Sequence, residues 1–176
     1  MNLLIVLFFF VLFFNNNYAQ DKKNESDSTY IVELKEFYDG KGVVFGRDVD
    51  YDIYPNNTDK RITLTKEDVI EAEKIMDSVA TLYYKDDIDG KKEYDSKLRG
   101  YFRQYWGFKN SSNEKRIMIF LYNFNNLEFK EEVEGKWDKG ICLSTSDFFY
   151  TNSGGLLVNL TKRKIVEGTF YPFKLE

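Results

Sequence analysis

An amphipathic segment in the middle of the chain constrains the fold most strongly. Thr65 precedes it, and Asp68 follows three residues later, which is the spacing of a helix capping box. Apolar side chains then recur at steps of three and four residues, at Val69, Ala72, Met76, Val79, Ala80 and Tyr83. This spacing predicts a helix over about 66–83 that buries one stripe of side chains.

The remaining periodic segments favour strands. The charged segment 85–96 predicts a loop, and the segment 98–109 then alternates with a period of two. The segment 115–124 is apolar on both sides of its alternation, which is typical of a strand inside a sheet. Shorter strands are predicted at 29–37, 43–45, 140–145, 155–160 and 164–170. One long helix and four to five antiparallel strands after it predict an α+β domain whose sheet curls around the helix.

The amino terminus carries an unbroken apolar run, LLIVLFFFVLFF, which begins at Leu3. As a helix it would span only about 18 Å, against a hydrocarbon core of about 30 Å. The run therefore predicts a signal peptide over 1–19, with Ala19 at the cleavage position. A buried core helix and a retained membrane anchor are the alternatives. A disordered tail over 20–28 and a single α+β domain over 29–176 would follow.

Composition excludes several kinds of chemistry. The chain has no histidine and one cysteine, Cys142, so histidine-based catalysis, histidine-ligated zinc and an intramolecular disulfide are impossible. The acidic segment 86–90 lacks carboxylates at the first and last positions of a calcium loop. Asp48, Asp50 and Asp52 could hold a cation, but an exposed edge is the favoured interpretation. We expect no metal and no cofactor.

A basic and aromatic strand face is the candidate binding site. Arg99, Tyr101, Arg103 and Tyr105 alternate within 98–109 and would share one side of a strand. Guanidinium groups interleaved with phenols can stack on sugars, bind an anion or anchor a protein. The alternative is that the tyrosines pack beneath the arginine stems while the guanidinium groups pair with neighbouring strands.

Two segments resemble a group of small secreted proteins from Bacteroidota to which no activity is assigned. Residues 61–73 read RITLTKEDVIEAE, which is similar to that group's R-x-T-x-T-x-x-[DQ]-[IV]-x-x-A-E. Residues 103–110 read RQYWGFKN and are followed by EKRI at 114–117, which is similar to R-Q-Y-x-G-[FY]-x-N and E-K-x-I. The resemblance spans about residues 61–124. It implies export and a cystatin-like outline, and it carries over no catalytic residue.

These observations favour an exported, non-catalytic binding or interaction module in the periplasm or outside the cell. Its partner would be a protein or a polysaccharide, with no stable membrane insertion after signal cleavage. The formal net charge of -4 and the predicted export argue against nucleic acid. One alternative is a small glycosidase-like hydrolase using two carboxylates, for which Glu33, Glu36, Asp87 and Glu114 are available. An inhibitor or immunity-type protein that meets a basic partner is another.

Export makes a direct prediction about the mature chain. We expect cleavage after Ala19, because the small residue follows the apolar run at the spacing of a signal peptide. Amino-terminal sequencing of the protein from an envelope fraction should begin at Gln20. A chain in that fraction that still begins at Met1 would contradict cleavage.

Overall fold

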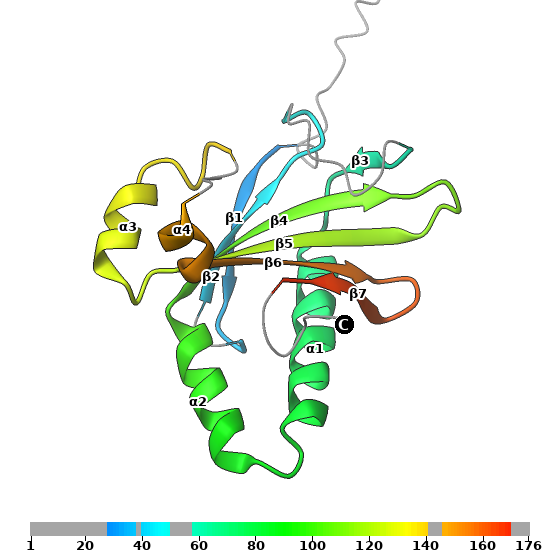
Figure 1. The fold of residues 1–176 in the computed structure, drawn as a ribbon. Coiled ribbons are helices and arrows are strands. Elements are labelled where there is room, and N and C mark those ends of the chain that lie inside the picture. Colours follow the sequence, from blue (N-terminus) through cyan, green and yellow to red (C-terminus); the bar gives the residue numbers. More distant parts are fainter. Residues whose placement is uncertain (1–27, 38–39, 50–57, 141–145, 170–176) are drawn as a thin grey trace, which may run out of the picture.

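The computed structural model describes residues 28–37, 40–49, 58–140 and 146–169. These residues form three layers, with one sheet between two pairs of helices (Figure 1). Helices α1 (Lys66–Tyr83) and α2 (Ile88–Arg99) supply side chains to the core on one face of the sheet. Helices α3 (Leu127–Val133) and α4 (Asp147–Asn152) supply them to the core on the other face. The predicted signal peptide and Cys142 lie outside the described residues.

The sheet has seven strands, in the order β1-β2-β4-β5-β6-β7, with β3 paired to β4 outside this path. All pairs are antiparallel except β2 and β4, which run parallel. The strands are β1 (Tyr30–Leu34), β2 (Gly40–Phe45), β3 (Lys60–Ile62), β4 (Tyr101–Lys109), β5 (Lys115–Asn123), β6 (Ser153–Asn159) and β7 (Lys164–Gly168).

The α+β class is confirmed, but the predicted architecture is wrong. A single long helix on four to five antiparallel strands, with a cystatin-like outline, is replaced by four helices and a larger, mixed sheet. The segment predicted to be a loop contains α2, whose buried side chains are only Tyr94 and Leu98. Such a narrow apolar stripe gives little periodic signal. Together α1 and α2 form the long crossover that a parallel β2–β4 pair requires.

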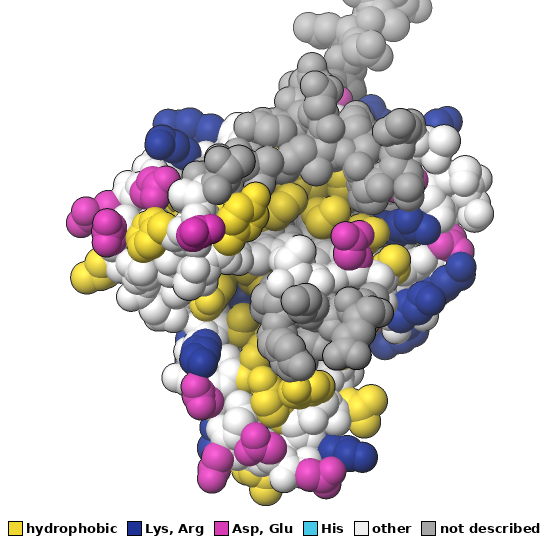
Figure 2. All heavy atoms as spheres, viewed as in Figure 1, with side chains coloured by type: hydrophobic (Ala, Val, Ile, Leu, Met, Phe, Trp, Pro, Cys, Tyr) yellow, Lys and Arg dark blue, Asp and Glu magenta, His cyan; other side chains and the backbone are white. Residues whose placement is uncertain are grey.

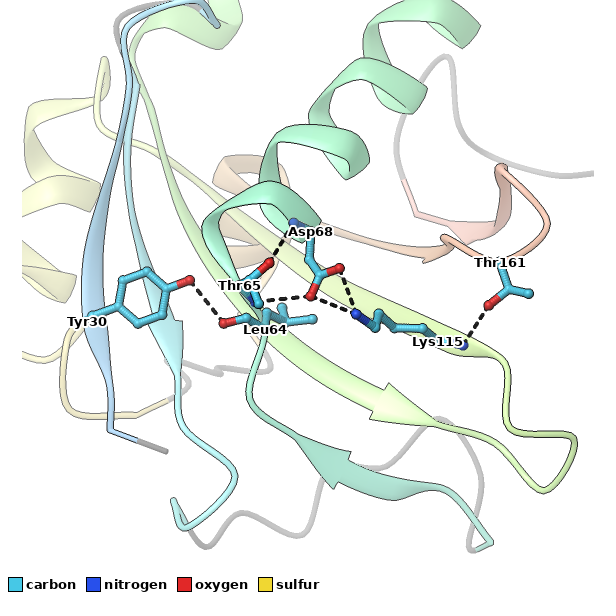
Figure 3. A network of polar contacts seen from close by, with 6 residues as sticks. All are labelled: Tyr30, Leu64, Thr65, Asp68, Lys115 and Thr161. Carbon is cyan, nitrogen blue, oxygen red and sulfur yellow. Dashed lines mark hydrogen bonds and ion pairs between the residues drawn. The ribbon is translucent and has the colours of Figure 1, made fainter. Parts of the chain in front are cut away.

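The start of α1 is fixed by its capping box and by contacts with two strands. The Thr65 Oγ1 accepts from the Asp68 backbone N–H at 3.2 Å, and the Asp68 carboxylate accepts from the Thr65 N–H at 3.0 Å. The same carboxylate accepts from Lys115 Nζ on β5 at 2.8 and 2.9 Å (Figure 3). From β1, the Tyr30 hydroxyl donates to the Leu64 carbonyl at 3.0 Å. The amino-terminal end of α1 is therefore attached to the edge strand β1 and to the interior strand β5.

Two central strands separate two hydrophobic cores. Ile117, Ile119 and Leu121 of β5 face the core beneath α1, and Tyr122 faces the core beneath α3 and α4. The prediction that this segment lies inside the sheet is confirmed, because β5 pairs with β4 on one side and β6 on the other. Strand β4 is buried on both faces as well. None of the described helices is long and apolar enough to cross a membrane.

Candidate functional site

The predicted Arg/Tyr face does not form one surface. Arg103 and Tyr105 have exposed fractions of 0% and lie on the side of β4 that faces α1. Tyr101 is half-buried against the same core. Arg99 is exposed, but it belongs to α2 and not to the strand, because the helix extends to this residue. A ligand would reach Arg103 or Tyr105 only if α1 moved away from the sheet.

Glu73 of α1 is the buried partner of these two side chains. Its carboxylate oxygen Oε1 accepts from the Tyr105 hydroxyl at 2.6 Å and lies 3.0 Å from Arg103 Nε. Arg103 Nη1 also donates to the Tyr101 carbonyl at 2.8 Å. Burial and the adjacent Glu73 charge raise the pKa of Tyr105 well above its ordinary value. The three side chains form one enclosed ionic network between α1 and β4.

The sequence offered one signal for this network. Glu73 lies four residues after Val69 and next to Ala72, within the buried stripe of α1. A carboxylate in an apolar stripe requires a buried cation or hydrogen-bond donor opposite it. The alternation of β4 identified Arg103 and Tyr105 as neighbours on one face, but it did not identify Glu73 as the residue that they contact.

A second polar cluster joins two turns at one end of the sheet. The Glu114 carboxylate accepts from Asn110 at 3.0 Å, from Asn159 at 2.8 Å and from Lys162 Nζ at 2.5 Å. These donors hold the pKa of Glu114 at about 2, with the Lys162 interaction the largest cause and Asn159 the next. Glu114 is therefore ionised at neutral pH and fastens the turn after β4 to the turn after β6.

A cavity of about 300 Å³ lies between the end of β1, the turn after it and the first two turns of α1. Its apolar lining comes from Leu34, Phe37 and Ile70. The charged side chains Glu33, Lys35, Glu36 and Lys66 complete the lining, with equal numbers of acidic and basic groups. The lining is thus more charged than that of most ligand sites, and the volume is at the small end of their usual range.

The acidic segments considered from the sequence do not form a metal site in the part of the chain described. Asp87 is the N-cap of α2, and its Oδ1 accepts from the Gly90 N–H at 2.8 Å. This contact explains the acidic segment 86–90 as a helix start. Among the described residues there is no group of three or more metal-ligating side chains. Asp50 and Asp52 fall outside the described ranges.

Comparison with protein-family models, with curated proteins and with solved structures finds no match to this chain. The arguments about function below therefore rest on the geometry of the described residues. Among the described residues, the cavity beside β1 and the turns at the Glu114 end of the sheet are accessible to a ligand.

The buried network makes a prediction about stability. Replacing Glu73 with Ala should lower the free energy of unfolding by about 3–5 kcal/mol, because Arg103 would remain buried without its counter-ion. The triple variant Glu73→Leu, Arg103→Met and Tyr105→Phe should recover much of that loss, since it removes all three polar groups together. Urea unfolding would measure both. A Glu73→Ala loss below about 1 kcal/mol would show that the network contributes little.

Glu114 makes a prediction about acid stability. Its folded-state pKa of about 2 lies below the ordinary value of 4.5, so its contribution is complete above pH 4.5 and is lost as the pH falls towards 2. A Glu114→Gln variant should be less stable than the wild type at pH 7. Between pH 4.5 and 2 its stability should then fall by less than that of the wild type. Thermal unfolding across this range measures the difference. Glu132→Gln, at an exposed position of α3, is the control and should follow the wild type.

Proposed function

We propose that the protein is an exported, non-catalytic binding module that holds its partner in the cavity between β1 and α1. The cavity itself is the observation that carries this proposal. Export is inferred from the apolar run that begins at Leu3. The partner is a protein or a polysaccharide, and the cavity would receive one of its side groups.

Ile70 is the residue that best distinguishes this cavity from ordinary packing. It is half-buried on α1 and lines the cavity, yet it belongs to neither hydrophobic core. Leu34 and Phe37, on the opposite wall, do contact the core beneath α1. The wall formed by Leu34 and Phe37 is therefore held in place by core packing. The opposite wall presents the Ile70 side chain, which a ligand can cover. Burial of such a side chain contributes about 1.5–3 kcal/mol at most.

Two of the four carboxylates considered for catalysis are engaged in structural contacts. Asp87 accepts from the Gly90 N–H as the cap of α2, and Glu114 is held by Lys162 with a pKa of about 2, so Glu114 cannot serve as a general acid near neutral pH. Arg103 and Tyr105 are enclosed against Glu73. These commitments support binding over turnover. Nothing in the geometry of the described residues favours the inhibitor or immunity-type alternative separately.

One observation favours the hydrolase alternative. Glu33 and Glu36 both line the cavity, so two carboxylates are available at the same accessible place. Glycoside hydrolysis requires such a pair, separated by about 5–9 Å. A screen of glycan and peptide substrates between pH 4 and 9 would test it, with Glu33→Gln and Glu36→Gln as inactive controls. Absence of turnover with the mature protein across the whole range would exclude this alternative.

Binding at the cavity predicts that a substitution in its lining weakens partner binding, while a substitution elsewhere on the surface does not. The Ile70→Asp variant should not capture a partner from the envelope fraction. In calorimetry with the purified partner, the dissociation constant of the complex should rise at least tenfold. The reason is that the variant places a charge on an apolar wall. Ile88→Asp is the matched control, because Ile88 is 70% exposed at the start of α2 and does not line the cavity.

Both variants should melt within a few degrees of the wild type. A partner that is lost equally with both variants, or with neither, would contradict the assignment of this cavity as the binding site.

A further inference from the structure

One end of the sheet carries a concentration of positive charge that the proposed function does not use. It includes the ends of β3, β4 and β5 and the turn between β6 and β7, where Figure 2 shows Lys and Arg side chains gathered. We call it the strand-end cationic surface, and its members are Lys60, Lys109, Lys115, Arg116, Lys162, Arg163 and Lys164. Among the described residues, fewer carboxylates lie at this end, and they are Asp59, Asp68, Glu71 and Glu114. Because the whole chain has a formal net charge of -4, its remaining residues together carry a larger net negative charge.

Three lysines of this surface lie directly opposite one another. Lys60 of β3 pairs with Lys109 of β4, and Lys109 pairs with Lys115 of β5. Directly opposed residues on neighbouring strands share a face, and like charges in such positions are destabilising. Lys115 is neutralised by Asp68 at 2.8 Å. Among the described residues, Lys60 and Lys109 have no ion pair that would offset the repulsion between these two lysines.

We propose that the strand-end cationic surface binds an acidic polysaccharide. Strands are spaced about 4.8 Å apart, so Lys60 and Lys109 on neighbouring strands present two positive charges at an interval close to the length of one sugar unit. An extended polysaccharide with one carboxylate per unit would place two successive anions beside the ammonium groups of Lys60 and Lys109. Ser111, Ser112 and Asn113 are exposed in the adjoining β4–β5 turn, where they can exchange hydrogen bonds with sugar hydroxyls.

The composition of the surface favours this ligand over other anions. A protein partner usually requires an exposed aromatic or aliphatic anchor, but the large exposed apolar residues of the described chain are not found at this end. They are Ile31, Leu82, Tyr83, Ile88, Leu127 and Tyr150. Single-stranded nucleic acid needs exposed aromatic rings for stacking, and a membrane surface needs apolar side chains that insert. A row of lysines beside hydroxyl and amide groups satisfies neither requirement.

Polygalacturonate oligosaccharides are the probe for this proposal, with dextran oligosaccharides of the same length as the neutral control. The mature protein should bind polygalacturonate at low ionic strength and not bind dextran. The double variant Lys60→Gln and Lys109→Gln should raise the dissociation constant at least tenfold and reduce its dependence on salt, since two charges are lost. Its melting temperature should not fall, because a repulsive pair is removed.

The matched control is Lys85→Gln with Lys92→Gln, which removes two exposed lysines near the α1–α2 connection. It should bind polygalacturonate as the wild type does, and so should Ile70→Asp, because the cavity and this surface are separate. The proposal is overturned if polygalacturonate does not bind, or if both lysine pairs reduce binding equally. It is also overturned if polyglutamate, duplex DNA or phosphatidylglycerol vesicles bind more tightly than polygalacturonate.

Discussion

The contact of Glu73 with Arg103 and Tyr105 is the interaction on which the arrangement of helix and sheet depends. It places one carboxylate of α1 against two donors of β4 in an interior that excludes water. Such charges are tolerated only when each is matched, so α1 cannot slide along the strand without leaving Arg103 uncompensated. The cavity beside β1 exists because α1 is held at this position, where Lys66 and Ile70 lie opposite Leu34.

Residues of the segments 61–73 and 103–117 contact one another in this chain. Glu73 binds Arg103, Asp68 binds Lys115, and Asn110 binds Glu114. The Arg61 guanidinium lies 4.3 Å from the centroid of the Trp106 ring, in the core beneath α3 and α4. These contacts join α1, β3, β4 and β5, so the two segments contribute to the packing of helix and sheet in this chain.

The local parts of the fold could be predicted, and the long-range parts could not. The capping box and the apolar stripe gave α1 its range, and the two-sided apolar pattern placed β5 inside the sheet. Helix α2 was missed because it buries only two side chains, and no local pattern reveals that β2 and β4 run parallel. The Arg/Tyr face was identified as a set, but alternation alone suggests that its polar side faces solvent. Its burial depends on Glu73, which is distant in the sequence.

The buried Glu73 network and the cluster at the strand end differ in whether they leave charged groups available to a ligand. Arg103 is fully buried, and its charge is matched by Glu73, so nothing outside the protein can use it. At the strand end, by contrast, Glu114 and Asp68 fasten the turns and α1 while Lys60 and Lys109 stay unmatched within the described chain. Because Glu114 has a pKa of about 2, it remains ionised in mildly acidic surroundings. The net positive charge at this end therefore does not change while Glu114 stays ionised. An acidic ligand that is itself ionised in the same pH range would meet this positive charge.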